Sequence, residues 1–333
     1  MAENMIPGHR FLSAVGGGAV DRPAVASATS VATTEAMARC GAVFPDAHLD
    51  PALMARLAAF ATVEAGYDGI MPLFSVVTES AALGAKVDWG QFDIMPSILE
   101  PLWREPEDIN IPDDFEGRES MATALEALRR LRAEYPHLAI IGKTFGPWSL
   151  SFHLFGVENV LVMTLEEPEK LKRIFAGVME ISVRSALAQI QAGADALCLG
   201  DHCSRDMCSP ATYREFLFPL HREFARRVPC PVVLHACGET SDRIDMFADS
   251  TLSCFHYDTR VPAKTAARLA GGKIALMGGV SNIESLLPGD EGRIAADVRS
   301  AMAAGVNIIG PECAVPLNTG MRSLRAITEA VSL

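Results

Sequence analysis

The chain has 333 residues, 49% of them hydrophobic, and a formal net charge of −12. This length is sufficient for a large buried core, and the acidic balance argues against nucleic acid or an anionic membrane surface as a partner. Eight cysteines without framework spacing, no secretory signal pattern and no run of about 18 uncharged apolar residues predict a cytoplasmic protein with free or metal-bound thiols.

Eight short apolar runs alternate with longer amphipathic stretches along the chain. Each run is mainly apolar, which is typical of strands that are buried on both faces, and most runs end at or directly before Gly, Asp, Ser or Cys. The predicted strands are residues 23–28, 67–74, 138–146, 196–201, 231–238, 251–258, 273–280 and 306–313.

Helical patterns fill the stretches between these runs. Asp50 and Ser209 each stand before a proline that begins such a pattern, as capping residues do. Eight strands alternating with helices predict an α/β fold, a single-domain (β/α)8 TIM barrel over residues 1–333 with residues 1–20 as an N-terminal extension. The alternative is a doubly wound open sheet, but no glycine-rich phosphate turn follows an early strand. The long segment 79–116 is expected to cover part of the barrel mouth.

Three residues of metal-ligand type stand at the ends of two predicted strands. His235 and Cys237 end the fifth strand on the same side, because they are two residues apart, and Cys313 ends the eighth. The C-terminal ends of barrel strands meet at one rim, where barrel enzymes keep their active sites. One imidazole and two thiols leave a coordination position open, which favours a catalytic zinc and a soft substrate such as a thiol. The alternative is a core histidine with two buried free cysteines.

Further polar residues end neighbouring strands. For Asp258 three roles stay open: a fourth zinc ligand, a partner that orients His235, or a carboxylate paired with Arg260 or a loop amide. Residues 201–208 contain ligand types as well, but their spacing favours a substrate-contacting loop in which Asp201 is best placed. No nucleophile elbow, Walker loop or HExxH helix is present, so hydrolase, kinase and zincin functions lack support.

Five short segments add a family resemblance that runs nearly end to end. They are Asp-Arg-Pro-Ala at 21–24, Gly-Ala-Val-Phe-Pro-Asp-Ala-His at 41–48, Glu-Ser-Ala-Ala-Leu-Gly-Ala-Lys-Val at 79–87, Gly-Pro-Trp-Ser-Leu at 146–150 and Gly-Pro-Glu-Cys-Ala-Val-Pro at 310–316. Through them the chain resembles the uroporphyrinogen decarboxylase superfamily and, within it, the cobalamin-dependent methyltransferase branch. This branch includes methylcobalamin:coenzyme M methyltransferases and the methyltransferase domain of chloromethane dehalogenation.

The resemblance implies methyl transfer and not decarboxylation. The methyltransferase branch carries a His-X-Cys…Cys zinc signature, which His235, Cys237 and Cys313 match and which the decarboxylases do not keep. The decarboxylases also have an arginine-rich segment after the first strand, where this chain reads Ser-Ala-Thr-Ser-Val-Ala-Thr at 27–33. Their substrate-binding aspartate corresponds to a position near Val76. A tetra-acidic porphyrinogen would therefore lack its anchors.

The implied reaction moves a methyl group between a corrinoid, such as methylcobalamin, and a zinc-activated thiol, such as coenzyme M. The implied cofactor is Zn²⁺, and the corrinoid is expected on a separate small corrinoid-binding protein that docks over the barrel mouth. Glu79, Asp201 and His153, which stands near the decarboxylase tyrosine position, are expected to contact the corrinoid.

Three points of function stay open. A sulfonated thiol needs a cation, for which Lys143, Arg205 and Arg260 are unranked candidates at strand ends. The reaction can run in the other direction, with a methyl halide or methoxyl compound as donor to cob(I)alamin. A non-catalytic tetrapyrrole-binding protein with structural zinc is the alternative from another class.

Overall fold

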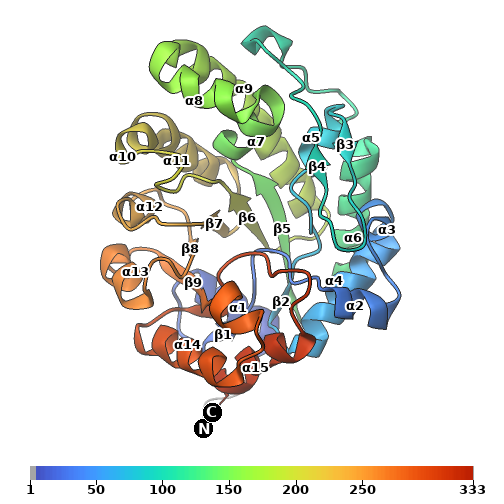
Figure 1. Cartoon of the computed structure of the whole chain (residues 1–333), viewed down its shortest axis with the longest axis vertical. Helices are drawn as coiled ribbons and strands as arrows, with labels where there is room; N and C mark the ends of the chain where they lie inside the picture. Colours follow the sequence, from blue (N-terminus) through green and yellow to red (C-terminus); the bar gives the residue numbers. More distant parts are fainter. Residues whose placement is uncertain (1–4, 333) are drawn as a thin grey trace.

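Eight parallel strands form the predicted barrel (Figure 1), in a computed structural model that describes residues 5–332. All eight lie inside the apolar runs that predict them, because strands covered by helices outside and side chains inside need apolar residues on both faces. The strands are β1 Ala24–Val25, β2 Gly69–Ile70, β5 Ala139–Phe145, β6 Ala196–Gly200, β7 Val232–Ala236, β8 Cys254–Tyr257, β9 Ala275–Val280 and β10 Ile308–Pro311.

Helices surround the barrel and alternate with the strands (Figure 1). Asp50 begins α4 as predicted, since its Oδ1 accepts hydrogen bonds from the next free backbone amides at 2.8 and 2.9 Å. None of the helices in the described part of the chain has the length and apolar composition needed to cross a membrane. The helices are α1 Pro7–Val15, α2 Thr34–Cys40, α3 Asp46–Leu49, α4 Pro51–Ala65, α5 Thr78–Ala82, α6 Glu119–Glu134, α7 Pro147–Phe155, α8 Val157–Glu166, α9 Pro168–Gln191, α10 Pro210–Thr212, α11 Phe218–Arg227, α12 Ile244–Ala248, α13 Ala263–Ala270, α14 Glu291–Ala303 and α15 Met321–Val331.

The barrel closes between β1 and β2 through a single residue, Asp68. Hydrogen-bonded strand ladders run in the order β1-β10-β9-β8-β7-β6-β5-β2, so β1 and β2 are the two ends of the sheet. The Asp68 backbone N–H donates to Val25 O at 2.7 Å, and the Asp68 carboxylate accepts from Val25 N at 2.8 Å. Arg10 and Arg22 pair with the same carboxylate at 2.7 and 3.0 Å. A buried, charge-assisted network therefore takes the place of a strand ladder.

Helix α1 belongs to the segment predicted as an N-terminal extension, and it packs against the barrel strands. Gly8 lies so near the start of β5 that a Cβ there would come within 2.9 Å of Ala139 N. Phe11 and Val15 are fully buried in the core. The division of the chain into one domain with an extension at 1–20 stays a prediction, and residues 1–4 lie outside the described part.

The segment 79–116 contains a short hairpin, β3 Val87–Asp88 paired with β4 Ser97–Ile98, which was not predicted. Figure 1 places this hairpin beside α5 and α6. Two 3-10 turns, Pro106–Asp108 and Phe115–Gly117, lead to α6. Trp103 fixes the segment to α7, since its backbone N–H donates to Leu154 O at 2.8 Å.

Candidate metal centre

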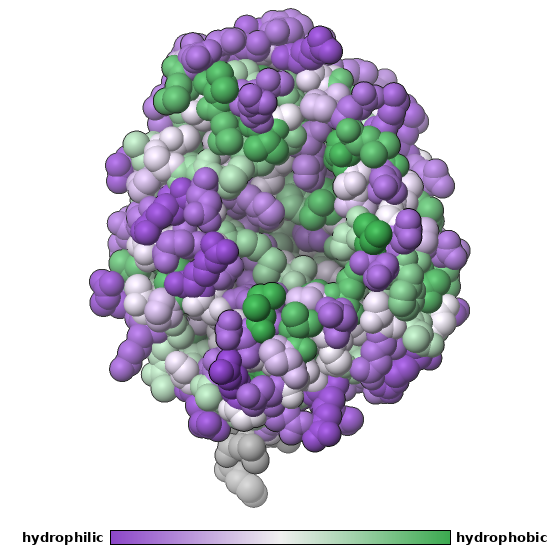
Figure 2. Space-filling model, in the orientation of Figure 1, coloured by the Kyte–Doolittle hydropathy of each residue, from purple (hydrophilic) through white to green (hydrophobic). Residues whose placement is uncertain are grey.

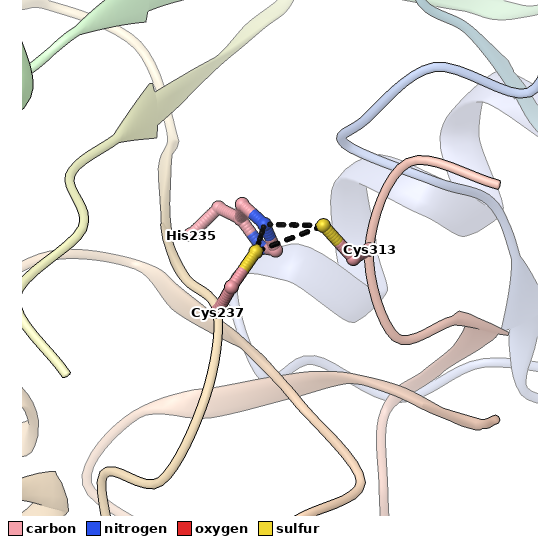
Figure 3. Close-up of side chains that lie close together, drawn as sticks. All are labelled: His235, Cys237 and Cys313. Atoms are coloured by element: carbon pink, nitrogen blue, oxygen red, sulfur yellow. Dashed lines mark hydrogen bonds between the residues drawn. The ribbon is translucent and has the colours of Figure 1, made fainter. Parts of the chain in front are cut away.

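The side chains of His235, Cys237 and Cys313 converge at the C-terminal ends of β7 and β10 (Figure 3). His235 Nε2 is 2.9 Å from Cys237 Sγ and 3.4 Å from Cys313 Sγ, and the two sulfur atoms are 2.8 Å apart. Cys237 and Cys313 stand on the loops that follow β7 and β10, and β8 and β9 lie between these two strands in the sheet. The structure thus brings together the three residues that the sequence predicts as metal ligands.

The position of Cys237 depends on the turn that follows it. Cys237 stands directly after β7, and Gly238 has a φ of +90°, a conformation that glycine adopts without strain. Asp258 holds this turn, because its Oδ2 accepts a hydrogen bond from Gly238 N at 2.8 Å while its Oδ1 accepts one from Arg260 N at 2.9 Å. Of the three roles open for Asp258, the structure shows the bond to loop amides. Asp258 lies outside the cluster of ligand atoms.

The position of Cys313 depends on its neighbour Glu312, which the sequence analysis did not single out. The buried Glu312 carboxylate accepts hydrogen bonds from Thr259 N at 3.0 Å and Asn282 N at 2.7 Å, and so ties the loops after β8 and β9 to the loop after β10. The Asn282 side chain in turn donates to Ala314 O at 2.8 Å. The only sign of this role in the sequence is that the Glu312 carboxylate stands directly before Cys313, a predicted ligand.

His235 is buried, both cysteines are half-buried, and the three side chains lie within hydrogen-bond distance of one another. The Cys237 thiol and the nearby His235 ring lower the pKa of the Cys313 thiol well below its usual range. His256 packs against His235 with ring centroids 4.5 Å apart, and its Nε2 is 2.8 Å from Pro311 O. Burial lowers the pKa of His256 well below its usual value, so the ring that packs against His235 is neutral. His235 Nδ1 is buried and has no hydrogen-bond partner within residues 5–332.

This donor set fits zinc. One imidazole nitrogen and two sulfurs lie within 4.8 Å of one another, and no other group of three such side chains does so in residues 5–332. Zinc prefers nitrogen and sulfur ligands, and a site with three protein ligands keeps one position for substrate. His235 Nε2 and the two sulfur atoms point toward one another, as the ligand atoms of one metal ion would.

Two of the residues predicted to contact a corrinoid are buried in contacts between elements. Asp201 is fully buried: its Oδ1 accepts from Ser149 N at 2.7 Å, and its Oδ2 is 2.9 Å from His221 Nε2. Glu79 is buried between α5 and α9, where its Oε1 accepts from Ser185 Oγ at 2.9 Å. Both carboxylates hold helices and loops together, and their contact with a corrinoid stays a prediction.

His153 lies outside the cluster of His235, Cys237 and Cys313. It belongs to α7, with its ring 5.9 Å from that of Phe145 at the end of β5. Burial, with a smaller effect of His202, lowers the pKa of His153 to about 4, so the ring is neutral at pH 7. Its role in corrinoid contact stays a prediction.

The matching family model is that of uroporphyrinogen decarboxylase (URO-D), and it covers residues 7–332. A methylated-thiol–coenzyme M methyltransferase of Methanosarcina mazei is 33% identical over 99% of this chain and 90% of its own length. A methylcobamide:CoM methyltransferase of Methanosarcina barkeri is 27% identical over 96% of both chains.

One solved structure agrees with these sequence relatives. A methyltransferase from Methanosarcina mazei superimposes with a TM-score of 0.96, at 27% identity and 99% coverage of both chains. The barrel and its order of strands are therefore those of a solved methyltransferase. The chain belongs to the uroporphyrinogen decarboxylase (URO-D) family and, within that family, to the branch of methyltransferases.

Proposed function

We propose that this protein transfers a methyl group between a corrinoid and a thiol, at a zinc ion held by His235, Cys237 and Cys313. The observation that carries the proposal is the convergence of these three ligand atoms at the C-terminal rim of the barrel. The relatives named as coenzyme M methyltransferases support a thiol as the methyl acceptor. A thiol such as coenzyme M is the substrate that a sulfur-rich zinc site accommodates.

The proposed step forms a sulfur–carbon bond and breaks a cobalt–carbon bond. Bound zinc supplies the Lewis acidity that converts a thiol, mostly protonated at neutral pH, to its thiolate. The substrate sulfur attacks the methyl carbon of methylcobalamin in line, both electrons of the cobalt–carbon bond stay on cobalt, and the thiol proton passes to solvent. His235, Cys237 and Cys313 would hold the metal. Asp258 and Glu312 hold the loops that carry Cys237 and Cys313, so the residues that would bind the metal are held in place before substrate arrives.

A partner that carries the corrinoid fits the face above the strand ends. Figure 2 shows that this face is hollowed at its centre, with apolar side chains exposed around the hollow. Exposed apolar residues belong to the hairpin segment and to α8; they are Phe92, Ile94, Leu99, Val157, Val162 and Leu165. Such patches are typical of protein interaction sites. All eight cysteines are free, which suits the reducing cytoplasm that we propose as the location.

Metal analysis and an absorbance assay test the proposal together. We expect one zinc per chain, and conversion of methylcobalamin to cob(I)alamin under anaerobic conditions when thiol is added. The Cys237→Ala variant is expected to lose zinc and activity together. Cys40→Ala is the matched control, because Cys40 is a half-buried thiol at the end of α2, away from the cluster.

Three outcomes separate the alternatives. Full activity in Cys237→Ala would overturn the metal site. Methylation of cob(I)alamin by methyl halides or methoxyl compounds, with no activity toward thiols, would show that the protein transfers the methyl group to the corrinoid and not from it. One tightly bound zinc with neither reaction would favour a non-catalytic binding protein.

A further inference from the structure

His202 is an exposed imidazole on the loop that follows β6, the strand next to β7 in the barrel. Two backbone hydrogen bonds hold this loop along the loop after β7. Asp201 N donates to His235 O at 2.9 Å, and Arg205 N donates to Glu239 O, also at 2.9 Å. His202 therefore lies between these two bonds, against the start of the loop after β7.

The strand register places His202 level with Cys237. Gly200, the last residue of β6, is paired with His235 on β7, and His202 and Cys237 each stand two residues further along their chain segments. Neighbouring strands lie about 4.8 Å apart, so these two residues start as neighbours at the rim of the barrel. His202 is thus a further imidazole beside the proposed metal centre, outside the group of three ligand atoms.

The His202 side chain points into the barrel mouth. Asp201 turns the other way, toward the helices, where it contacts Ser149 on α7 and His221 on α11. Asp201 and Cys203 are fully buried, whereas His202 between them is exposed. Because successive side chains of an extended segment alternate in direction, His202 faces the hollow that Figure 2 shows at the centre of this face.

The backbone of His202 is fixed while its ring is free. Its N–H donates to Ser149 Oγ at 2.7 Å, and its C=O accepts from Trp148 Nε1 at 3.1 Å, so α7 holds it on both sides. Within residues 5–332 the ring itself has no hydrogen bond or ion pair. The ring is therefore held at a defined place with both nitrogens open to a ligand.

The ring of His202 is neutral at neutral pH. Solvent reaches it, but the surrounding protein displaces much of its water, and this desolvation lowers the pKa of His202 from 6.5. The His235 ring lowers this pKa further, while Cys313 and Asp201 act in the opposite direction. The facing His153 is neutral as well, since burial lowers its pKa to about 4. A neutral imidazole has one unprotonated nitrogen, which can accept a proton.

Three other basic groups around the cluster are engaged elsewhere. Asp258 accepts hydrogen bonds from two loop amides, and Glu312 accepts from two others. His256 is fully buried, with its Nε2 2.8 Å from Pro311 O. Compared with these groups, His202 is both accessible and unpaired.

We propose that His202 is the base that removes the proton of the substrate thiol as its sulfur binds at the proposed metal centre. The inference rests on the proposed function, because it needs a thiol to bind there. The S–H bond breaks, its electron pair stays on sulfur, and the proton moves to the unprotonated ring nitrogen of His202, from which it passes to solvent. Such a transfer requires hydrogen-bond reach, either directly or through one water molecule. The sulfur then holds the electron pair that attacks the methyl carbon.

The first test varies the acidity of the thiol. With methylcobalamin as donor, kcat/KM is measured at neutral pH for 2-mercaptoethanol, a weakly acidic thiol, and for trifluoroethanethiol, a more acidic one. His202→Gln should lower kcat/KM by about 100-fold for 2-mercaptoethanol, the lower end of the effect of a general base, and by less than about 10-fold for trifluoroethanethiol, which ionises more readily. Added imidazole should restore part of the activity of His202→Ala, which a merely structural role would not allow. His9→Gln is the matched control, because His9 is an exposed histidine on α1, and it should keep the wild-type values.

A second measurement does not require methyl transfer. A pH indicator in weakly buffered solution follows proton release by stopped flow when 2-mercaptoethanol is added to the zinc-loaded protein without corrinoid. Release should be about 100-fold slower in His202→Gln than in the wild type, at equal zinc content. The inference is overturned if His202→Gln keeps the wild-type kcat/KM, loses activity equally toward both thiols, releases the proton at the wild-type rate or loses its zinc; the proposed function then still stands. Proton release that depends on His202, with no demethylation of methylcobalamin by any thiol, supports the base and overturns the proposed reaction.

Discussion

Replacing Glu312 by alanine would loosen the proposed metal centre without touching a ligand atom. The Glu312 carboxylate is 7% exposed and accepts hydrogen bonds from the backbone N–H groups of Thr259 and Asn282, at 3.0 and 2.7 Å. In the alanine variant both amides lose their acceptor. The loop that carries Cys313 then loses its attachment to the loops after β8 and β9.

The expected size of the effect follows from these two hydrogen bonds. A buried amide left without an acceptor costs about 1–3 kcal/mol, so the free energy of unfolding should fall by about 2–6 kcal/mol. Loss of an outer partner of a metal ligand typically lowers metal affinity by about 10- to 100-fold, and we expect this range for zinc. Glu312→Gln keeps one carbonyl acceptor but turns its NH2 group toward an amide donor, so its loss should be intermediate.

The assays are urea unfolding followed by circular dichroism, and competition for zinc with a chromophoric chelator. Glu166→Ala on α8 is the matched control, because Glu166 is exposed and such substitutions change stability by less than about 0.5 kcal/mol. If Glu312→Ala unfolds within about 0.5 kcal/mol of the wild type and binds zinc equally well, the positioning role of Glu312 is refuted.

Three further substitutions test other parts of the structure. Asp258→Ala leaves Gly238 N without its acceptor and should weaken zinc binding more than it weakens folding; unchanged zinc affinity in chelator competition would contradict this. Asp68→Asn removes the charge that pairs with Arg10 at the β1–β2 closure and should lower the free energy of unfolding by about 3–5 kcal/mol in urea; a loss below about 1 kcal/mol would show that the closure is held elsewhere. Burial lowers the pKa of His48 from 6.5 to about 3. Below about pH 6.5 His48 is therefore protonated in the unfolded chain but not in the folded protein, so the free energy of unfolding falls as the pH drops. His48→Phe should therefore avoid about 2 kcal/mol of the wild-type loss between pH 7 and pH 5, and equal losses in both proteins would rule out this assignment.

The barrel could be predicted from the sequence because its strands are continuous apolar runs. The metal centre could be predicted for a similar reason: His235, Cys237 and Cys313 have rare ligand chemistry and stand where strands end, and the barrel brings strand ends together. The predicted strands were longer than the observed ones at several ends. Hydrogen-bonded pairing stops before the apolar residues do, since the residues beyond a strand still pack in the core.

The roles of the carboxylates could not be predicted in the same way. Asp201 and Glu79 stand at plausible positions, but each is satisfied by a partner that no local pattern indicates. For Asp258 the sequence left three roles open, and only the structure selects the bond to loop amides. The partner of Glu79 is Ser185, 106 residues further along the chain. The surroundings of Lys143, Arg205 and Arg260 also required the structure, because the two arginines pair with Asp242 and Asp206 while the charges of Cys198, Glu79 and Cys313 act on Lys143.

The two loops of the proposed metal centre also set an order of events during folding. Cys237 and Cys313 are 76 residues apart, and β8 and β9 stand between their strands in the sheet. Contacts between such distant residues form late, after the intervening chain has been ordered. A chain still under synthesis has His235 and Cys237 exposed well before Cys313 is made, so it presents only two of the three ligands. We therefore expect metal capture to be coupled to completion of the last strand, β10, and not to precede it.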